Sequence, residues 1–182
     1  MEEEVPGMLI LVLGGGASGK SARAEDLACG FSGKRLYVAT MEPFGAEAEK
    51  RIARHRAMRS EKGFESVDCY RELSSLDPQK DTQVILLECL GNLLANEMFG
   101  RDAPGCEDRI RRGLMHLEGL PNIKHLVVVS NEVSLDGDRY DPETLEYIRI
   151  LNRLNGWLAD RADRVEEVVC GIPLLLKGEE GV

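Results

Sequence analysis

The residues best suited to chemistry in this sequence form a glycine-rich loop near the N-terminus. It fits the pattern G-x-x-x-x-G-K-[ST]. Glycines let the backbone approach a ligand closely, so successive N–H groups can point inward and bind phosphate oxygens. Lys20 would reach the β and γ phosphates, and the hydroxyl of Ser21 would hold Mg²⁺. The phosphate loop, and hence the predicted nucleotide site, comprises Gly14, Gly15, Gly16, Ala17, Ser18, Gly19, Lys20 and Ser21.

A nucleotide site of this kind also needs a carboxylate at the end of a strand, acting on Mg²⁺ or its waters. Glu88 directly follows the apolar run Val84–Leu87, and Glu132 follows a second apolar run at 127–129. Either side chain could instead cap a helix or face solvent. We expect Glu88 to act on the metal together with Ser21, and Glu132 is the other candidate.

A basic segment interrupts this acidic chain. Residues 50–59 contain five Lys or Arg side chains and no acid. On a helix, Arg51, His55 and Arg59 share one face, because they are spaced at i, i+4 and i+8. Their positive charges repel one another unless an anion lies between them, and a polyphosphate would also gain bidentate guanidinium contacts. This face is therefore suited to a nucleotide's phosphates.

His55 is the histidine with the strongest case for chemistry. The surrounding positive charge favours its neutral imidazole, which can act as a nucleophile. Attack on a nucleotide's α-phosphate would release pyrophosphate and leave a phosphoramidate. The same spacing also fits a solvated helix paired with nearby glutamates, or a kinase lid whose arginines bind ATP. We expect His116, within a helix, and His125, at the start of a strand, to be structural.

Apolar runs alternate with helical stretches along the chain, and several runs are nearly continuous, as in strands covered on both faces. This pattern predicts one α/β domain over 1–182, with a mostly parallel sheet flanked by helices and a loose extension at 1–7. The expected strands are Met8–Leu13, Arg35–Ala39, Val84–Glu88, His125–Ser130, Val165–Cys170 and Leu174–Lys177. The expected helices are Lys20–Cys29, Ala46–Lys62, Gly91–Phe99, Cys106–Glu118 and Pro142–Ala162. Ligands of such sheets bind at the carboxyl ends of the strands.

Composition narrows the function classes. The chain has 182 residues, 43% of them apolar and 30% charged, which is typical of a globular domain. Its net charge of -9 argues against general binding to nucleic acids or anionic membranes. No apolar run reaches the roughly 18 residues of a membrane span, and the start at 1–4 is acidic, unlike a signal peptide. We expect a cytoplasmic protein whose five scattered cysteines are reduced.

Several motifs support a more specific interpretation. The phosphate loop combined with the histidine helix at 51–59 and the Asn-Glu-Val segment at 131–133 resembles the bifunctional adenosylcobinamide kinase / adenosylcobinamide-phosphate guanylyltransferase family of cobalamin biosynthesis. The resemblance spans Met8 to Lys177. Its further motifs are Tyr37–Thr40, Leu86–Leu90 with Asn96, Asn155, Ala162-Asp163 and Gly171–Pro173.

The resemblance implies a RecA-like P-loop NTPase fold, a homotrimer and two reactions that use Mg²⁺ with GTP or ATP. A nucleoside triphosphate would phosphorylate adenosylcobinamide, and GTP would then give GMP to His55, from which the phosphorylated cobinamide would take it. The expected catalytic residues are Lys20 and His55. The other residues that the resemblance places near the nucleotide are Thr40, Met41, Glu42, Arg56, Arg59, Asp68 and Glu88.

The sequence also departs from the family pattern. Ala17 stands where an arginine is usual in the phosphate loop, and Leu135–Asp141 is unlike the corresponding stretch of the family. Two other functions therefore stay open. One is a P-loop small-molecule kinase with the basic helix as its lid, and the other is a nucleotide-binding regulatory relative without catalysis.

Overall fold

The computed structural model describes residues 7–43, 52–53, 56–57, 59–100, 104–133 and 140–179. The seven strands are β1 (Met8–Gly14), β2 (Lys34–Ala39), β3 (Phe64–Asp68), β4 (Thr82–Glu88), β5 (His125–Val129), β6 (Arg164–Val169) and β7 (Ile172–Lys177). The helices are α1 (Lys20–Gly30), α3 (Leu90–Phe99), α4 (Cys106–Glu118), α5 (Pro142–Arg161) and the short 3₁₀ helix η1 (Leu73–Ser75).

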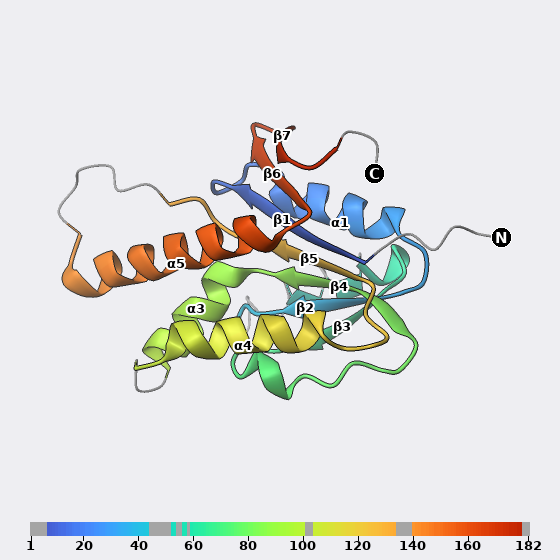
Figure 1. The fold of residues 1–182 in the computed structure, drawn as a ribbon, viewed down its shortest axis with the longest axis horizontal. Coiled ribbons are helices and arrows are strands. Elements are labelled where there is room, and N and C mark those ends of the chain that lie inside the picture. The colour runs from blue at the N-terminus through green and yellow to red at the C-terminus, as the bar shows by residue number, and fades with distance from the viewer. Residues whose placement is uncertain are drawn as a thin grey trace.

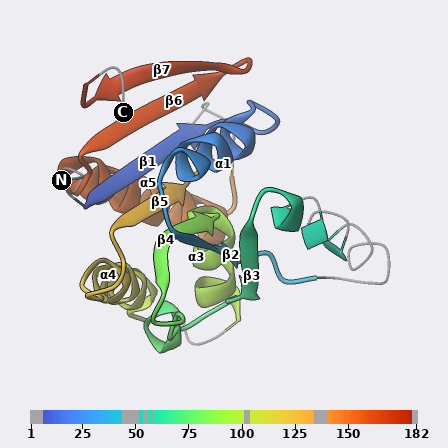
Figure 2. The same cartoon turned by 90° about the vertical axis from the view of Figure 1, so that its right-hand side faces the viewer.

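All seven strands form one sheet in the order β3-β2-β4-β5-β1-β6-β7. The first six strands in this order are parallel, and only β7 is antiparallel to its neighbour β6. Figure 2 shows the twist of the sheet, with β7 at one edge and β3 at the other. The predicted mostly parallel α/β sheet is therefore confirmed.

The helices cover both faces of the sheet, with α1 on one face and α3, α4 and α5 on the other (Figure 1). Each face has its own apolar core: Ala24, Leu27 and Ala28 of α1 pack in one, while the other takes the inward leucines of α3, α4 and α5. The central strands are thus buried on both sides, and all five residues of β5 are buried. This double burial explains why these strands are continuous apolar runs in the sequence.

Most expected elements lie where the sequence pattern put them. β3 was not predicted, because its five residues include only two large apolar side chains and lie at the edge of the sheet. β7 begins at Ile172, two residues before the expected strand, after a tight turn at Cys170 and Gly171, both with positive φ. Of the expected helix Ala46–Lys62, the described residues from Ile52 to Glu61 are helical and the others lie outside the described residues. The expected N-terminal extension at 1–7 also lies outside them, except for Gly7.

None of the described helices combines the length and the apolar character that crossing a membrane requires. Cys29, Cys69, Cys89, Cys106 and Cys170 are all free thiols, and burial raises the pKa of three of them (Cys69, Cys89 and Cys106).

His125 makes the stability of the fold depend on pH. Its ring is buried and stacks on Phe31 with the centroids 3.8 Å apart. Burial and the nearby charge of Lys124 lower the pKa of His125 below the ordinary 6.5. The folded protein therefore keeps the ring neutral, whereas the unfolded chain takes up a proton as the pH falls through about 6.5.

We expect the stability that His125 contributes to be present above pH 6.5 and to be lost as the pH falls towards its folded-state pKa. In His125→Phe, which keeps a ring against Phe31 but cannot titrate, the free energy of unfolding should fall less between pH 7 and pH 5 than in the unsubstituted protein. Urea titrations at a series of pH values measure both slopes. Equal slopes would show that His125 does not set this dependence.

Candidate functional site

The phosphate loop turns from β1 into α1 in a conformation that requires glycine at two positions. A Cβ on Gly14 would lie 2.8 Å from the carbonyl oxygen of Val168, and Gly19 has a φ of +93°. Among the described residues, no side chain caps the start of α1, so its first N–H groups stay available to an anion. Lys20 extends back over the loop, and its Nζ donates to the carbonyl oxygen of Gly15 at 2.8 Å.

The turn between β6 and β7 supports the loop from the other side. The backbone N–H of Gly171 donates to the carbonyl oxygen of Ser18 at 2.8 Å. A Cβ on Gly19 would approach the Cα of Gly171 to 3.3 Å, so the two turns are closely packed. The loop is therefore fixed to the sheet edge that carries β7.

Ser21 and Glu88 meet beside the phosphate loop. Glu88 is the last residue of β4, and the hydroxyl of Ser21 donates to its Oε1. The hydroxyl of Tyr37, on β2, donates to Oε2 of the same carboxylate at 2.8 Å. A hydroxyl and a carboxylate are oxygen donors of the kind that Mg²⁺ accepts alongside substrate phosphates, so this pair fits a metal-nucleotide site.

Glu132, the other candidate carboxylate, has different partners. Its backbone N–H donates to the carbonyl oxygen of Gly14 at 3.2 Å. A hydrogen bond with the neighbouring carboxyl of Glu167 raises the pKa of Glu132. Glu167 pairs with Leu13 on β1, and Leu13 packs against the core of α3, α4 and α5. Glu88 and Glu132 were the two predicted carboxylates, and Glu88 is the one that hydrogen-bonds to Ser21.

The described part of the basic segment lies against α1, β2 and β3. Nη2 of Arg56 donates to both carboxylate oxygens of Asp68, at 2.8 and 2.9 Å. The guanidinium carbon of Arg59 lies 3.6 Å from the ring centroid of Tyr37. Lys62, just after the helix, forms an ion pair with Glu25 of α1 at 2.5 Å. The side chains of Arg56, Arg59 and Asp68 therefore lie on the same face as the phosphate loop and its helix, while His55 and Arg51 are outside the described residues.

Thr40, the first residue after β2, anchors the segment that follows this strand. Thr40 is fully buried, and its hydroxyl donates to the carbonyl of Cys89 at 2.8 Å and accepts from the N–H of Cys89 at 2.7 Å. This pair of bonds ties the end of β2 to the end of β4. Met41 is 44% exposed, and Glu42 forms an ion pair with Arg71 at 2.8 Å. Of the three predicted residues, Met41 is exposed, Glu42 is half-buried against Arg71 and Thr40 anchors the strand ends.

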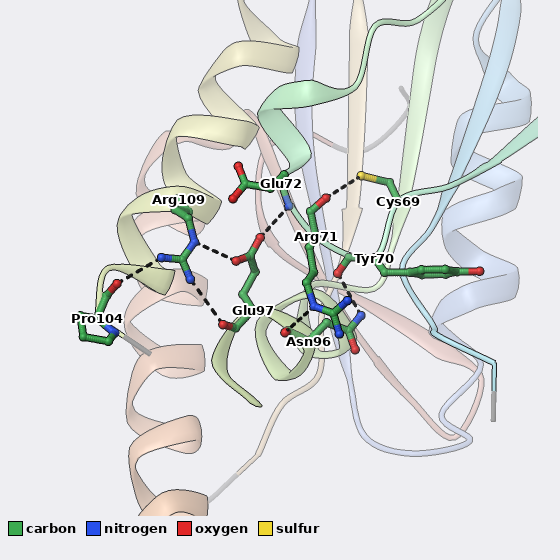
Figure 3. A network of polar contacts seen from close by, with 8 residues as sticks. All are labelled: Cys69, Tyr70, Arg71, Glu72, Asn96, Glu97, Pro104 and Arg109. Carbon is green, nitrogen blue, oxygen red and sulfur yellow. Dashed lines mark hydrogen bonds and ion pairs between the residues drawn. The ribbon is translucent and has the colours of Figure 1, made fainter. Parts of the chain in front are cut away.

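Asn96 and Arg71 connect this segment to α3. The side-chain amide of Asn96 donates to the carbonyls of Thr40 and Tyr70, at 2.7 and 3.0 Å. Arg71 in turn donates from Nε to the carbonyl of Asn96 at 2.9 Å. Figure 3 shows Arg71 and Asn96 side by side in this network. The position of Glu42 therefore depends on α3 as well as on β2.

A buried carboxylate extends the same network towards α4 (Figure 3). Glu97 is 1% exposed, accepts from the N–H of Glu72 at 2.6 Å and pairs with Nε of Arg109 at 2.8 Å. Arg109 also donates to the carbonyl of Pro104 at 3.1 Å. Removing one partner of such a buried pair is costly, because the other charge stays in a low-dielectric environment. The network thus fixes the segment 70–72 between α3 and α4.

Sequence reasoning missed two residues of this site. In the sequence, Tyr37 belonged only to a strand motif. The partner of its hydroxyl, Glu88, could not be predicted without knowing that β2 lies beside β4. Arg71 lies in an irregular segment with no periodicity, so no local pattern indicated its contact with Glu42.

Comparison with known proteins agrees with the geometry. The sequence profile of the family described as "Cobinamide kinase / cobinamide phosphate guanyltransferase" matches residues 10–176. The chain belongs to this family. It is 32% identical over 171 residues to the bifunctional adenosylcobalamin biosynthesis protein CobP of Pseudomonas aeruginosa, with 93% of this chain and 97% of that protein covered. It is also 32% identical over 186 residues to the bifunctional adenosylcobalamin biosynthesis protein CobU of Salmonella typhimurium, covering 93% of this chain and all of that protein.

Among solved structures, the flagellar accessory protein FlaH of Methanocaldococcus jannaschii superimposes with a TM-score of 0.52 at 13% identity, covering 98% of this chain and 82% of that one. This likeness concerns the fold alone. The RecA-like P-loop fold expected from the resemblance is confirmed. The members of this family are bifunctional kinases and guanylyltransferases. The chain is therefore a nucleotide-dependent enzyme.

Proposed function

We propose that this chain phosphorylates adenosylcobinamide and then transfers GMP from GTP to the product through a guanylylated His55. The observation that carries the proposal is the docking of the described part of the basic segment against the sheet and the phosphate-loop helix. Arg56 pairs with Asp68 at the end of β3, Arg59 stacks on Tyr37 of β2, and Lys62 contacts the phosphate-loop helix through Glu25. Family membership over 93% of the chain supports both activities.

In the kinase step, the acceptor group is the hydroxyl of the aminopropanol arm of adenosylcobinamide. Its oxygen attacks the γ-phosphorus of the nucleoside triphosphate. The bond from that phosphorus to the bridging oxygen breaks, a nucleoside diphosphate leaves and the hydroxyl proton is released. Lys20 and the N–H groups of the loop and of the first turn of α1 stabilise charge on the phosphates. In the structure Lys20 donates to the loop's own carbonyl at Gly15, and a bound phosphate would take over that contact.

In the guanylylation step, a ring nitrogen of His55 attacks the α-phosphorus of GTP. The phosphorus–nitrogen bond forms as pyrophosphate leaves. A phosphate oxygen of the phosphorylated cobinamide then attacks the same phosphorus, and the bond to the imidazole breaks to give adenosylcobinamide-GDP. Of the described residues of the basic segment, Arg56 and Arg59 supply guanidinium groups that would stabilise the phosphate charge. Arg56 pairs with Asp68, and Arg59 stacks on Tyr37.

The metal expected from the chemistry is Mg²⁺. Ser21 and Glu88 would hold it, and when bound it would neutralise charge on the nucleotide's phosphates. The contact between the Ser21 hydroxyl and the Glu88 carboxylate supports this assignment, because both donors already converge beside the phosphate loop.

We further propose a cytoplasmic homotrimer. The family resemblance is the basis for both statements. Association is also supported by β7, whose outer residues Ile172, Leu174 and Leu176 are 62%, 45% and 58% exposed. Alternating positions on an edge strand point to the same side, so these three side chains form one apolar strip that a second copy could cover.

One assay tests both reactions. The protein is incubated with adenosylcobinamide, Mg²⁺ and GTP labelled either on the α- or on the γ-phosphate, and the cobinamide products are separated. The proposal expects γ-label in adenosylcobinamide-phosphate, and α-label first on the protein and then in adenosylcobinamide-GDP. Transfer of γ-label alone would indicate a small-molecule kinase. Nucleotide binding without any turnover would indicate a regulatory relative.

A further inference from the structure

Tyr37 is a buried residue that contacts several parts of the site. It lies on β2 between β3 and β4 and is 5% exposed. Its ring and the ring of Phe64 form a T-shaped pair, with an interplanar angle of 85° and a centroid distance of 6.2 Å. Packing of this kind leaves the ring little freedom to change rotamer.

The hydroxyl of Tyr37 orients the carboxylate of Glu88. It donates to Oε2 at 2.8 Å, while the hydroxyl of Ser21 donates to Oε1. A phenolic hydroxyl ordinarily keeps its proton near neutral pH, so the Tyr37 hydroxyl acts as a donor to this carboxylate. With a rigid partner on one oxygen, the plane of the carboxylate is fixed towards Ser21 before any ligand binds.

The face of the same ring carries the basic segment. The guanidinium of Arg59 stacks over it with 3.6 Å between Cζ and the ring centroid. A cation at this distance is attracted by the negative face of the ring. The contact adds to the ion pair between Arg56 and Asp68, which holds the segment to β3. A single side chain thus contacts both the carboxylate beside the phosphate loop and the helix that precedes β3.

We propose that Tyr37 is a positioning residue: its hydroxyl sets Glu88 for the metal-nucleotide complex, and its ring docks the basic segment beside that complex. The inference rests on the proposed function, in which Glu88 and Ser21 hold Mg²⁺ and the basic segment contacts the phosphates. It also explains why a tyrosine stands at a buried strand position, where a hydroxyl is costly unless it has a partner.

Two substitutions separate the two roles. Tyr37→Phe keeps the ring under Arg59 and removes only the hydroxyl bond to Glu88. Tyr37→Leu removes both. Tyr147→Phe is the control, because Tyr147 is a half-buried tyrosine whose hydroxyl donates to a backbone carbonyl, that of Gly91, at 3.1 Å.

The first measurement is the affinity for the α,β-methylene analogue of GTP, by calorimetry, over a series of Mg²⁺ concentrations and in EDTA. This analogue cannot guanylylate the protein, so binding is read without turnover. In Tyr37→Phe the Mg²⁺ concentration that gives half of the metal-dependent strengthening should rise about 10-fold, since partners that orient metal ligands typically contribute 10- to 100-fold in metal affinity. The affinity in EDTA and the melting temperature should stay close to those of Tyr147→Phe.

The second measurement is hydrogen exchange at the end of the basic segment. The N–H groups of Lys62 and Gly63 donate to the carbonyls of Arg59 and Ser60, both at 3.0 Å. Exchange at these amides should accelerate in Tyr37→Leu and stay unchanged in Tyr37→Phe.

An unchanged Mg²⁺ dependence in Tyr37→Phe would overturn the role of the hydroxyl, and so would an equal loss of affinity in EDTA. Unchanged exchange in Tyr37→Leu would overturn the role of the ring. An unsubstituted protein that binds the analogue without any effect of Mg²⁺ would refute the inference as well. If instead Mg²⁺-dependent binding responds as expected but GTP never labels the protein, the inference holds and the proposed guanylyl transfer fails.

Discussion

Replacing His55 with alanine should abolish the covalent guanylylated protein. The imidazole is the group that forms the bond to the α-phosphorus, so its removal leaves no intermediate rather than a slower one. After incubation with GTP labelled on the α-phosphate, the unsubstituted protein should carry label that is stable to base and labile to acid, as expected of a phosphoramidate. His55→Ala should carry none above background. Its kinase activity, followed with γ-labelled GTP, should persist.

His116→Ala is the matched control for this experiment. His116 lies on α4, on the side of the sheet opposite to α1, and its ring lies 3.4 Å from the carbonyl oxygen of Leu76. This variant should be labelled as fully as the unsubstituted protein. Label that survives in His55→Ala would remove His55 from the mechanism and favour the interpretation of the basic segment as a lid.

Replacing Lys20 with alanine should lower the rate of γ-phosphoryl transfer about 100- to 1000-fold, the range found when a preorganised group that stabilises transition-state charge is removed. The loss should appear in kcat more than in the melting temperature. Within the part of the chain that the structure describes, the hydrogen bond of Lys20 goes to the carbonyl of Gly15 in its own loop and joins no other element, so we expect the fold not to depend on it. Initial rates with adenosylcobinamide and γ-labelled GTP give kcat, and thermal unfolding gives the stability.

Lys34→Ala controls for the loss of a lysine as such. Lys34 begins β2, at the end of the sheet away from the phosphate loop, and forms surface ion pairs with Glu65 and Asp81. Pairs of this kind contribute little to stability, so activity and melting temperature should both remain close to the original values. A Lys20→Ala rate within tenfold of the unsubstituted protein would exclude the proposed role of its ammonium group.

The site lies where elements that are distant in the sequence meet. The ends of β2, β3 and β4 lie in one row, because Ala39 pairs with Asp68 on one side and with Glu88 on the other. The turn into α1 brings Ser21 to the same row. Parallel strands separated by crossovers make this convergence general for such sheets, and it is why ligands bind at their carboxyl edge.

Local patterns predicted the central strands and the helices well. β1, β5 and the stretch Val84–Leu87 of β4 are almost entirely apolar because both faces are covered, and such runs are recognisable in isolation. β3 had no comparable signal. Two of its five residues are exposed, and the strand exists through its pairing with β2. Edge strands depend on their neighbour in this way, so their sequence alone is weakly informative.

The sequence by itself determined two features of short spacing, a phosphate-loop motif between a strand and a helix and a run of guanidinium groups around one histidine, and it predicted their chemistry. Only the tertiary structure decided that Glu88 rather than Glu132 joins Ser21, and that Tyr37 lies between Glu88 and Arg59. The physical reason is that a side chain's partners across a sheet follow from strand order and register. Strand order and register are set by the packing of both faces of the sheet, and they cannot be predicted from residues that are adjacent in the sequence.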